Sequence, residues 1–298
     1  MSVSTSLKKL NRIKYNRTQY VPKDIIVMTT LHLIPLLAIF TGAGWFEWSL
    51  CIGLYFARMF FITGGYHRYF AHRSYKTSRW FQFFLAFMAQ TSMQKGALWW
   101  AANHRVHHHH SDDLEDPHSM KHYGFLHSHI GWIFIPNFKK TKVNIIRDFA
   151  KYPELRWLNR NHVVPPLTLM IAVALAGGFY HFEGTTESFL IGAASSLLIG
   201  FFLSTVILYH GTYSINSLMH LIGNKRYNTP DNSRNNFFLA LLTMGEGWHN
   251  NHHYYMASAR QGFFWWEIDI TYYILKIFSF LGLIWDINPV PDKVKNNH

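Results

Sequence analysis

The stretch WSLCIGLYFARMFFITGGYHRYFAH, from Trp48 to His72, decides the fold class of this chain. Residues 48–66 are mostly apolar. A helix needs roughly 20 such residues to cross the hydrocarbon core of a bilayer, which is about 30 Å thick. His67 and His72 follow directly. The sequence therefore predicts a membrane-spanning helix that reaches water at two side chains of the type that most often binds metals.

Three further stretches are long and apolar enough to span a membrane: residues 25–45, 163–182 and 188–210. Two short links join the four predicted spans in pairs. They are FEW near Glu47 and FEGTTES around Glu183, and neither contains Lys or Arg. The spans are therefore predicted to form two hairpins whose turns lie on the same side of the membrane.

Basic residues gather on the opposite side of these spans. Residues 67–162 contain fourteen Lys and Arg, and the part after His210 contains seven. Because cytoplasmic loops are enriched in Lys and Arg, the pattern predicts that both termini and the long middle segment are cytoplasmic. The N-terminal tail adds six more basic residues to the same side: Lys8, Lys9, Arg12, Lys14, Arg17 and Lys23.

The predicted fold is an all-α integral membrane protein with four transmembrane helices in two hairpins. A cytoplasmic helical cap, formed by residues 67–162 and 211–298, is expected to cover them, with the chain 1–298 as a single domain. Residues 80–94 and the aromatic stretch 263–287 favour helices that lie at the membrane interface, with a fifth span as the alternative for the second. Arg58, a formal charge within a span, is interpreted as snorkelling to the interface, with substrate binding as the alternative.

The composition excludes one class of metal site and favours another. The chain has 298 residues and one cysteine, Cys51, so it offers no disulfide framework and no thiolate metal site. A formal charge of +12 points to anionic partners such as phosphate head groups, and we expect no nucleic-acid partner. The 20 histidines are the informative excess, because imidazole is the commonest metal ligand.

Two further histidine clusters share one spacing, H-x-x-H-H, within NHRVHHHH and GEGWHNNHH. Positions i, i+3 and i+4 of an α-helix lie within about 60° of one another, so each cluster is predicted to aim three imidazoles at one point. A solvated or pH-sensing patch is the alternative for the HHHH run alone. The clusters are His104, His107 and His108, followed by His109 and His110, and then His249, His252 and His253.

The first pair is spaced differently. Five steps along an α-helix separate His67 from His72 by about 140°, so a straight helix cannot turn both to one ion. The pair suits two neighbouring ions, or a helix that ends between them. Three clusters on one predicted side indicate metal binding, and imidazole-rich sites suit Zn, Cu, Fe or Ni.

The segments HRYFAH, HRVHH and HNNHH resemble the three histidine boxes of the membrane fatty acyl desaturases, specifically the delta-9 group. The similarity extends to DPH (116–118), SHIGW (128–132), NSLMHLIG (216–223) and SARQGFFWWEIDIT (258–271). It covers roughly residues 52–273 in the order of the family. The topology predicted from charge agrees with that of the family.

The resemblance implies a non-haem di-iron centre that uses O₂ as co-substrate, with no fused haem. The implied metal ligands are the box histidines and one more histidine, with an asparagine that acts through water: His67, His72, His104, His107, His108, His220, His249, His252, His253 and Asn216. His109 and His110 fall outside this ligand pattern. Carboxylates near the boxes are candidates to orient the imidazoles, with salt bridges or helix caps as alternatives: Asp112, Asp113, Glu115, Asp116 and Glu246.

An acyl chain would need a narrow apolar tunnel past the metals. Cys51 and Tyr55 lie one turn apart on the span before the first box and are predicted to line it. Tyr55 is hypothesised to limit chain length, with ordinary packing as the alternative. A phosphate-bearing carrier is expected to meet cytoplasmic basic residues, among them Arg68, Arg73, Lys76, Arg105 and Lys121.

The predicted function is O₂-dependent introduction of a cis double bond, at the ninth carbon, into an acyl-CoA or a membrane-lipid acyl chain. Electrons are expected from a separate b-type cytochrome, ferredoxin or rubredoxin. The WWEID stretch looks like the bacterial branch, which suggests a bacterial inner membrane. The alternatives are a hydroxylase on the same scaffold and a metal-transporting or metal-sensing protein. His32 is isolated within a span, and with His162 and His181 it is interpreted as structural or interfacial.

Overall fold

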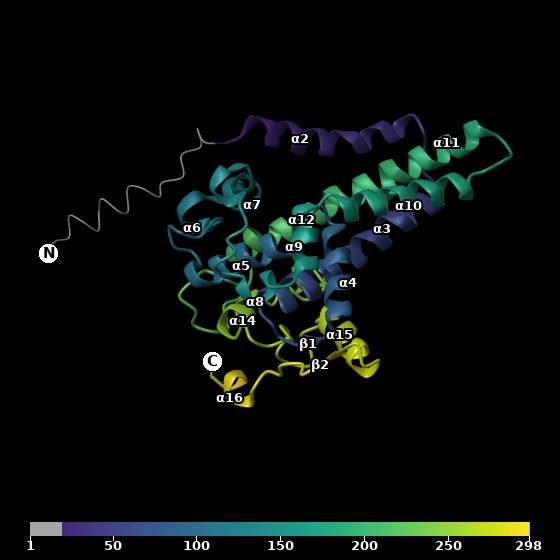
Figure 1. Cartoon of the computed structure of the whole chain (residues 1–298). Helices are drawn as coiled ribbons and strands as arrows, with labels where there is room; N and C mark the ends of the chain where they lie inside the picture. The colour runs from purple at the N-terminus through teal and green to yellow at the C-terminus, as the bar shows by residue number, and fades with distance from the viewer. Residues whose placement is uncertain (1–19, 298) are drawn as a thin grey trace.

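The computed structural model describes residues 20–297, and it is almost entirely helical (Figure 1). A long pair of antiparallel helices extends away from a group of shorter ones. Five of the basic residues that support the predicted topology lie outside the described residues: Lys8, Lys9, Arg12, Lys14 and Arg17.

Three helical stretches are long and apolar enough to cross a membrane. The first, Pro22–Ile39, combines helix α2 (Pro22–Leu33) with the 3₁₀-helix η2 (Ile34–Ile39). The second, Trp45–Ala71, combines α3 (Trp45–Phe60) with the π-helix η3 (Phe61–Ala71). The third is Thr186–His220, and it is built from α11 (Thr186–Ser195), the π-helix η6 (Ser196–Leu203), α12 (Ser204–Asn216) and η7 (Leu218–His220).

The remaining predicted span corresponds to α10 (Val164–Tyr180), which has 17 residues. It qualifies as a span only together with α9 (Pro153–Arg160), from which it is bent by 67°. Pro165 and Pro166 occupy its first turn, where the missing N–H groups cost nothing, so a new helix begins there. By length and composition the described part of the chain therefore contains three spans, or four if the bent pair counts as one.

Small and polar side chains hold these helices together. Gly177 lies against Gly192 and Ser196, and an added Cβ there would collide with both, so α10 and the α11–η6 helix pack closely. Arg58 is buried and donates to the hydroxyls of Thr205, at 2.7 Å, and Ser204. The snorkelling interpretation of Arg58 is therefore wrong, because the side chain joins two spans inside the bundle.

Two amphipathic segments pack on the bundle rather than crossing it. Helix α4 (Arg79–Gln90) buries Phe81, Leu85 and Ala89, three residues on one face, and η3 lies next to it. Helix α15 (Ile270–Phe280) has 11 residues, which is too short to cross the hydrocarbon core. This length removes the alternative of a fifth span there.

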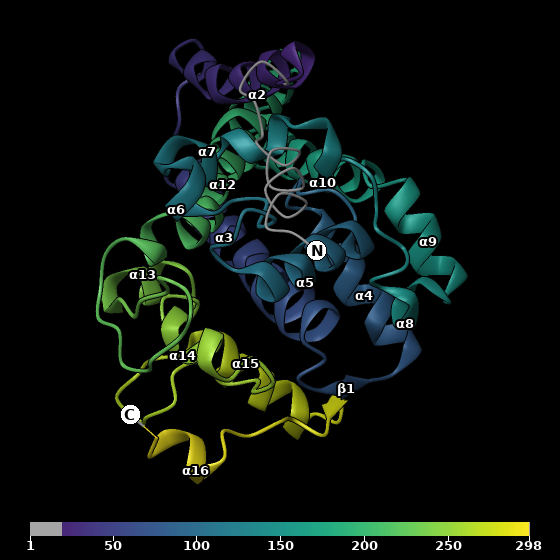
Figure 2. The same ribbon diagram turned by 90° about the vertical axis from the view of Figure 1, so that its left-hand side faces the viewer.

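The remaining elements lie around α5 (Ala97–His110), which Figure 2 shows near the centre of the molecule. A two-stranded antiparallel ribbon pairs β1 (Lys76–Thr77) with β2 (Ile284–Trp285) and so ties the C-terminal segment to the end of the second span. The other short helices are α6 (Met120–Tyr123), α7 (Phe125–His129), η4 (Gly131–Phe134), η5 (Pro136–Phe138), α8 (Arg147–Ala150), α13 (Phe237–Leu242), α14 (His249–Tyr254) and α16 (Asp292–Lys295).

Candidate metal centre

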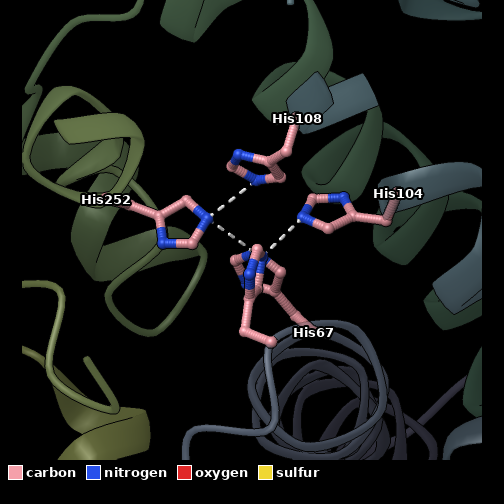
Figure 3. Close-up of side chains that lie close together, drawn as sticks. His67, His104, His108 and His252 are labelled. Carbon is pink, nitrogen blue, oxygen red and sulfur yellow. Dashed lines mark hydrogen bonds between the residues drawn. The ribbon is translucent and has the colours of Figure 1, made fainter. Parts of the chain in front are cut away.

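Nine histidines from four segments meet in two adjacent groups. Each histidine contributes one ring nitrogen, and the contributed nitrogens of a group all lie within 4.8 Å of one another. Figure 3 shows four rings of the first group pointing toward one another. The first group is His67, His72, His104, His108 and His252, and the second is His107, His220, His249 and His253.

Helix α5 divides its three predicted ligands between the two groups. His104 and His108 join the first group, whereas His107 joins the second. Helix α14 divides in the same way, with His252 in the first group and His249 in the second, next to His253. The prediction that each cluster aims three imidazoles at one point is therefore wrong. Consecutive helical residues diverge by about 100°, so two neighbouring histidines serve two neighbouring groups.

His67 and His72 lie in the same group because the helix between them is a π-helix. The amide of His72 donates to the carbonyl of His67 at 3.1 Å, a bond across five residues. This wider turn stacks residues five apart, as an α-helix stacks residues four apart. Helix η3 ends at Ala71, so a helix end between the two residues is confirmed, and the alternative that they serve two ions is wrong.

In the first group the Nε2 atoms face one another. The His67–His252, His72–His104 and His108–His252 Nε2 pairs are each 3.0 Å apart. Burial, together with the neighbouring imidazoles, holds the pKa of His72, His104, His108 and His252 well below the ordinary value. These rings are therefore neutral, and their lone pairs converge on one point, which is what a divalent metal ion requires.

The second group has the same character. The Nε2 atoms of His220 and His249 are 3.1 Å apart. Burial lowers the pKa of His253 to about 4, although Asp231 opposes this effect. The His253 Nε2 atom is buried and has no hydrogen-bond partner among residues 20–297. An imidazole lone pair without a partner fits a metal ion at this point.

Three of the predicted carboxylates contact rings of the two groups. Asp116 lies 3.0 Å from His107 Nδ1 and Asp112 lies 3.2 Å from His220 Nδ1. The third carboxylate, Glu246, lies 2.6 Å from the Nδ1 atom of His67. A carboxylate that accepts the Nδ1 hydrogen fixes the tautomer and directs the Nε2 lone pair toward the centre.

The other two predicted carboxylates do not reach either group. Asp113 is exposed, and Glu115 pairs with His110 at 3.3 Å, outside the two groups. The sequence reasoning also missed Asp231, whose carboxylate lies 2.6 Å from His253 Nδ1. It considered only carboxylates near the boxes in sequence, and Asp231 lies 22 residues before its partner.

A family model described as fatty acid desaturase matches residues 43–276. The chain belongs to the fatty acid desaturase family. It is 33% identical over 288 residues to the palmitoyl-monogalactosyldiacylglycerol delta-7 desaturase of Arabidopsis thaliana, covering 94% of this chain and 73% of that protein. It is 34% identical over 297 residues to an acyl-CoA C20 Delta5-desaturase of Anemone leveillei, covering 98% and 89%. A third relative, the sn-2 palmitoyl-lipid 9-desaturase of Nostoc sp. (strain 36), is 34% identical over 269 residues, with 87% of each chain covered.

The chain is thus an oxidoreductase of the acyl desaturase class. A cavity of this desaturase opens beside the first histidine group, where His67 and His104 line it. Asn216 belongs to neither group but lines this cavity. His118 also lines it, and its ring packs against His107 with centroids 4.3 Å apart. The remaining wall is mostly apolar or aromatic and includes Ile62, Thr63, Gln94, Trp99, Trp100, Trp132, Thr212 and Ile215.

Cys51 and Tyr55 line a separate apolar groove between α3, α12 and α13. The Tyr55 hydroxyl donates to the Leu242 carbonyl at 2.7 Å, and this hydrogen bond fixes the position of the Tyr55 ring. Tyr55 and Met59 both lie against Gly211, where an added Cβ would come within 2.9 Å of each side chain. Neither Cys51 nor Tyr55 is among the residues that line the cavity beside the histidines.

The structure changes the account of the basic residues in this desaturase. Arg68 is buried and forms ion pairs with Glu246, at 3.1 Å, and Asp269, at 2.9 Å. Arg105 is bound to Asp148 by two hydrogen bonds of 3.0 and 2.8 Å. The prediction that these two arginines meet a carrier is wrong, because both are engaged inside the fold. The other three predicted contacts, Arg73, Lys76 and Lys121, are exposed or partly exposed.

Proposed function

We propose that this desaturase uses two iron ions and O₂ to introduce a cis double bond into a saturated acyl chain, at the delta-9 position. The observation that carries the proposal is the pair of convergent imidazole groups, the first of which borders a mostly apolar cavity through His67 and His104. When bound, two iron ions with O₂ supply the strongly oxidising chemistry that removes hydrogen from an unactivated methylene, which side chains cannot supply.

Each histidine group would hold one ion. Five imidazoles would bind the first ion and four would bind the second, with Asn216 contributing to the second through a water. Neutral imidazoles bring no charge, so the ions keep their full positive charge toward oxygen. The proposed ligands are His67, His72, His104, His108 and His252 for the first ion, and His107, His220, His249, His253 and Asn216 for the second.

The carboxylates maintain the ligand geometry. Asp116, Asp112 and Asp231 accept hydrogens from three rings of the second group, and Glu246 does the same for His67. Burial alone would raise the pKa of Asp116, but the rings of His107 and His118 hold it below the ordinary value. Asp116 therefore stays ionised at neutral pH and keeps the His107 ring in one orientation.

The acyl chain would lie in the cavity beside His67 and His104. Trp100 stacks on the His104 ring with centroids 4.9 Å apart, so the indole lies between that ligand and the chain. Gln94 donates to Thr212 at 2.9 Å across the wall. These contacts fix the shape of the cavity and exclude water, so one methylene is held beside the histidines while others are not.

The position of the double bond follows from the distance between the carrier and the metals. Relatives act at different positions, as the delta-7, Delta5 and 9-desaturases show. Our proposal of delta-9 rests on the delta-9-type segments that flank the boxes. Tyr55 is proposed to limit chain length from the separate apolar groove that it lines with Cys51.

The acyl chain is proposed to be carried by coenzyme A or by a membrane lipid. Coenzyme A and phospholipids both carry phosphate groups. Lys95 lies against Trp99, which lines the cavity, with its ammonium 4.3 Å from the centroid of the Trp99 ring. Electrons would come from a separate b-type cytochrome, ferredoxin or rubredoxin. We propose four spans, with the histidines and both termini on the cytoplasmic side of a bacterial inner membrane.

The proposal is tested by mass spectrometry of fatty acids from a host that lacks the activity but supplies an electron donor. Wild type should yield a new cis-9 monounsaturated acid, and His107→Ala should yield none. His109→Ala is the matched control, because His109 is exposed and lies outside both groups. A hydroxy acid would establish a hydroxylase instead. No new product from folded, iron-loaded protein would contradict the proposal for the substrates of that host.

A further inference from the structure

A string of three histidines lies outside both groups, where α2, α7 and α12 meet (Figure 2). His32 Nε2 is 3.1 Å from His210 Nε2, and the other nitrogen of His210 is 3.0 Å from His129 Nε2. His129 Nδ1 is in turn 2.9 Å from the Ser217 hydroxyl. The prediction that His32 is isolated is therefore wrong.

Both ends of this histidine string stop at backbone carbonyls. His32 Nδ1 lies 2.7 Å from the Met28 carbonyl oxygen. At the other end, the Ser217 hydroxyl lies 2.9 Å from the backbone carbonyl oxygen of Tyr213. Carbonyl oxygens only accept hydrogen bonds, so every hydrogen must come from the string itself. The five contacts need five hydrogens, but three neutral imidazoles and one hydroxyl supply only four.

The four hydrogens can be placed so that both carbonyls accept one. Each hydrogen then points toward the nearer carbonyl, and all contacts are made except the one between His32 and His210. Two Nε2 lone pairs then face each other across 3.1 Å. Such a contact is repulsive unless a cation lies at it. In this arrangement each of the two imidazoles donates its other ring hydrogen to a fixed acceptor, as metal-ligating histidines do.

The cation is either a proton or a metal ion. Two bonds of about 2.0–2.1 Å, the usual length for zinc and imidazole nitrogen, span a 3.1 Å separation at an angle of about 100°. This angle is close to tetrahedral, so both lone pairs can bind one ion.

We propose that His32 and His210 form a third, peripheral metal site for a borderline divalent ion such as Zn²⁺, with His129 as the residue that positions His210. The site joins the first candidate span to α12. Helix α2 has no buried residue of its own, so an ion at this point would add a fixed connection where apolar packing supplies little. The site is independent of the desaturation reaction and of the two groups proposed to hold iron.

The test is isothermal titration of the iron-loaded protein in lipid nanodiscs with ZnCl₂. Wild type should bind one equivalent of Zn²⁺, and His32→Ala and His210→Ala should each weaken that binding at least tenfold with unchanged iron content. His162→Ala is the control and should bind as wild type does. His129→Ala should weaken binding less, because it leaves both ligand atoms in place.

A second measurement guards against a variant that misfolds. Cu²⁺ added to the iron-loaded wild type should give an electron paramagnetic resonance spectrum with two coupled nitrogens, reduced to one in His32→Ala. Equal Zn²⁺ binding by wild type and both single variants would overturn the proposal. So would an absence of Zn²⁺ binding in wild type, which would leave a shared proton as the cation of the string.

Discussion

The two histidine groups share helices α5 and α14 but are supported in different ways. In the second group three rings are backed by aspartates, namely Asp116, Asp112 and Asp231. In the first group one ring, that of His67, contacts a carboxylate, Glu246, among the described residues, and the π-helix η3 sets the angle between this ring and that of His72. The second group thus depends on electrostatic support and the first on backbone geometry, so different changes should disrupt each.

Loss of a ring should have the largest effect on either group. His108→Ala removes a first-group ligand, and we expect loss of one iron and of detectable desaturation. The neighbouring His109→Ala should retain both irons, because His109 is exposed and belongs to neither group. Metal analysis and product analysis of the two purified variants check this. Full activity of His108→Ala would mean that the group is not a metal site.

A change of backbone register should separate the two groups. One alanine inserted between Arg68 and Tyr69 places six steps between the first-box histidines, so they diverge in either an α-helix or a π-helix. We expect loss of the first-group iron and retention of the second, measured by Mössbauer spectroscopy with ⁵⁷Fe. The control is an alanine inserted after Gly184, in the exposed link between α10 and α11. Equal loss of iron from both groups would contradict the inference that only the first group depends on η3.

Loss of a single carboxylate charge should have a smaller effect. Asp231→Asn should weaken iron binding at the second group by about 10- to 100-fold, the range typical of residues that orient metal-bound histidines. Glu246→Gln should act in the same way on the first group. Asp113→Asn is the matched control, because Asp113 is exposed. Competition with a graded series of chelators gives the three affinities, and equal affinities would show that these contacts do not support the metals.

The smallest effect is expected far from both groups. Tyr55→Ala opens the apolar groove toward the cavity without touching a histidine. We expect unchanged iron content and turnover within about twofold, with the product profile shifted to longer chains. Ile52→Ala, on the exposed side of the same groove, is the control. An unchanged chain-length profile would reduce Tyr55 to a packing residue.

The sequence predicted the members of the site better than their arrangement. Composition and spacing identified eight of the nine clustered histidines, because imidazole is a common metal ligand, and family resemblance added His220. The division of His107 from His108 was not predicted, because it depends on which helix face meets which neighbour. The position of His72 depended on a π-helix, and nothing in the pattern FITGGYHRYFA was recognised as its signal.

Contacts between distant segments were the other gap. Asp231 was not predicted as part of the site, and Arg68 was predicted to meet a carrier, because sequence alone does not show burial. His32 appeared isolated since its partner, His210, is 178 residues away. The four predicted spans all became helices, but the 67° bend between α9 and α10 could not be inferred from hydropathy.

The ion pairs of Arg68 have a consequence for biosynthesis. Arg68 forms an ion pair with Glu246, and Glu246 in turn contacts the ring of His67. Arg68 also forms an ion pair with Asp269 and donates a hydrogen bond of 2.8 Å to the Ala259 carbonyl. The first box is therefore complete only after a segment some two hundred residues later has been translated and has docked. Metal insertion must then follow release of nearly the whole chain from the ribosome. A nascent chain that stalls before Asp269 would leave Arg68 without that carboxylate.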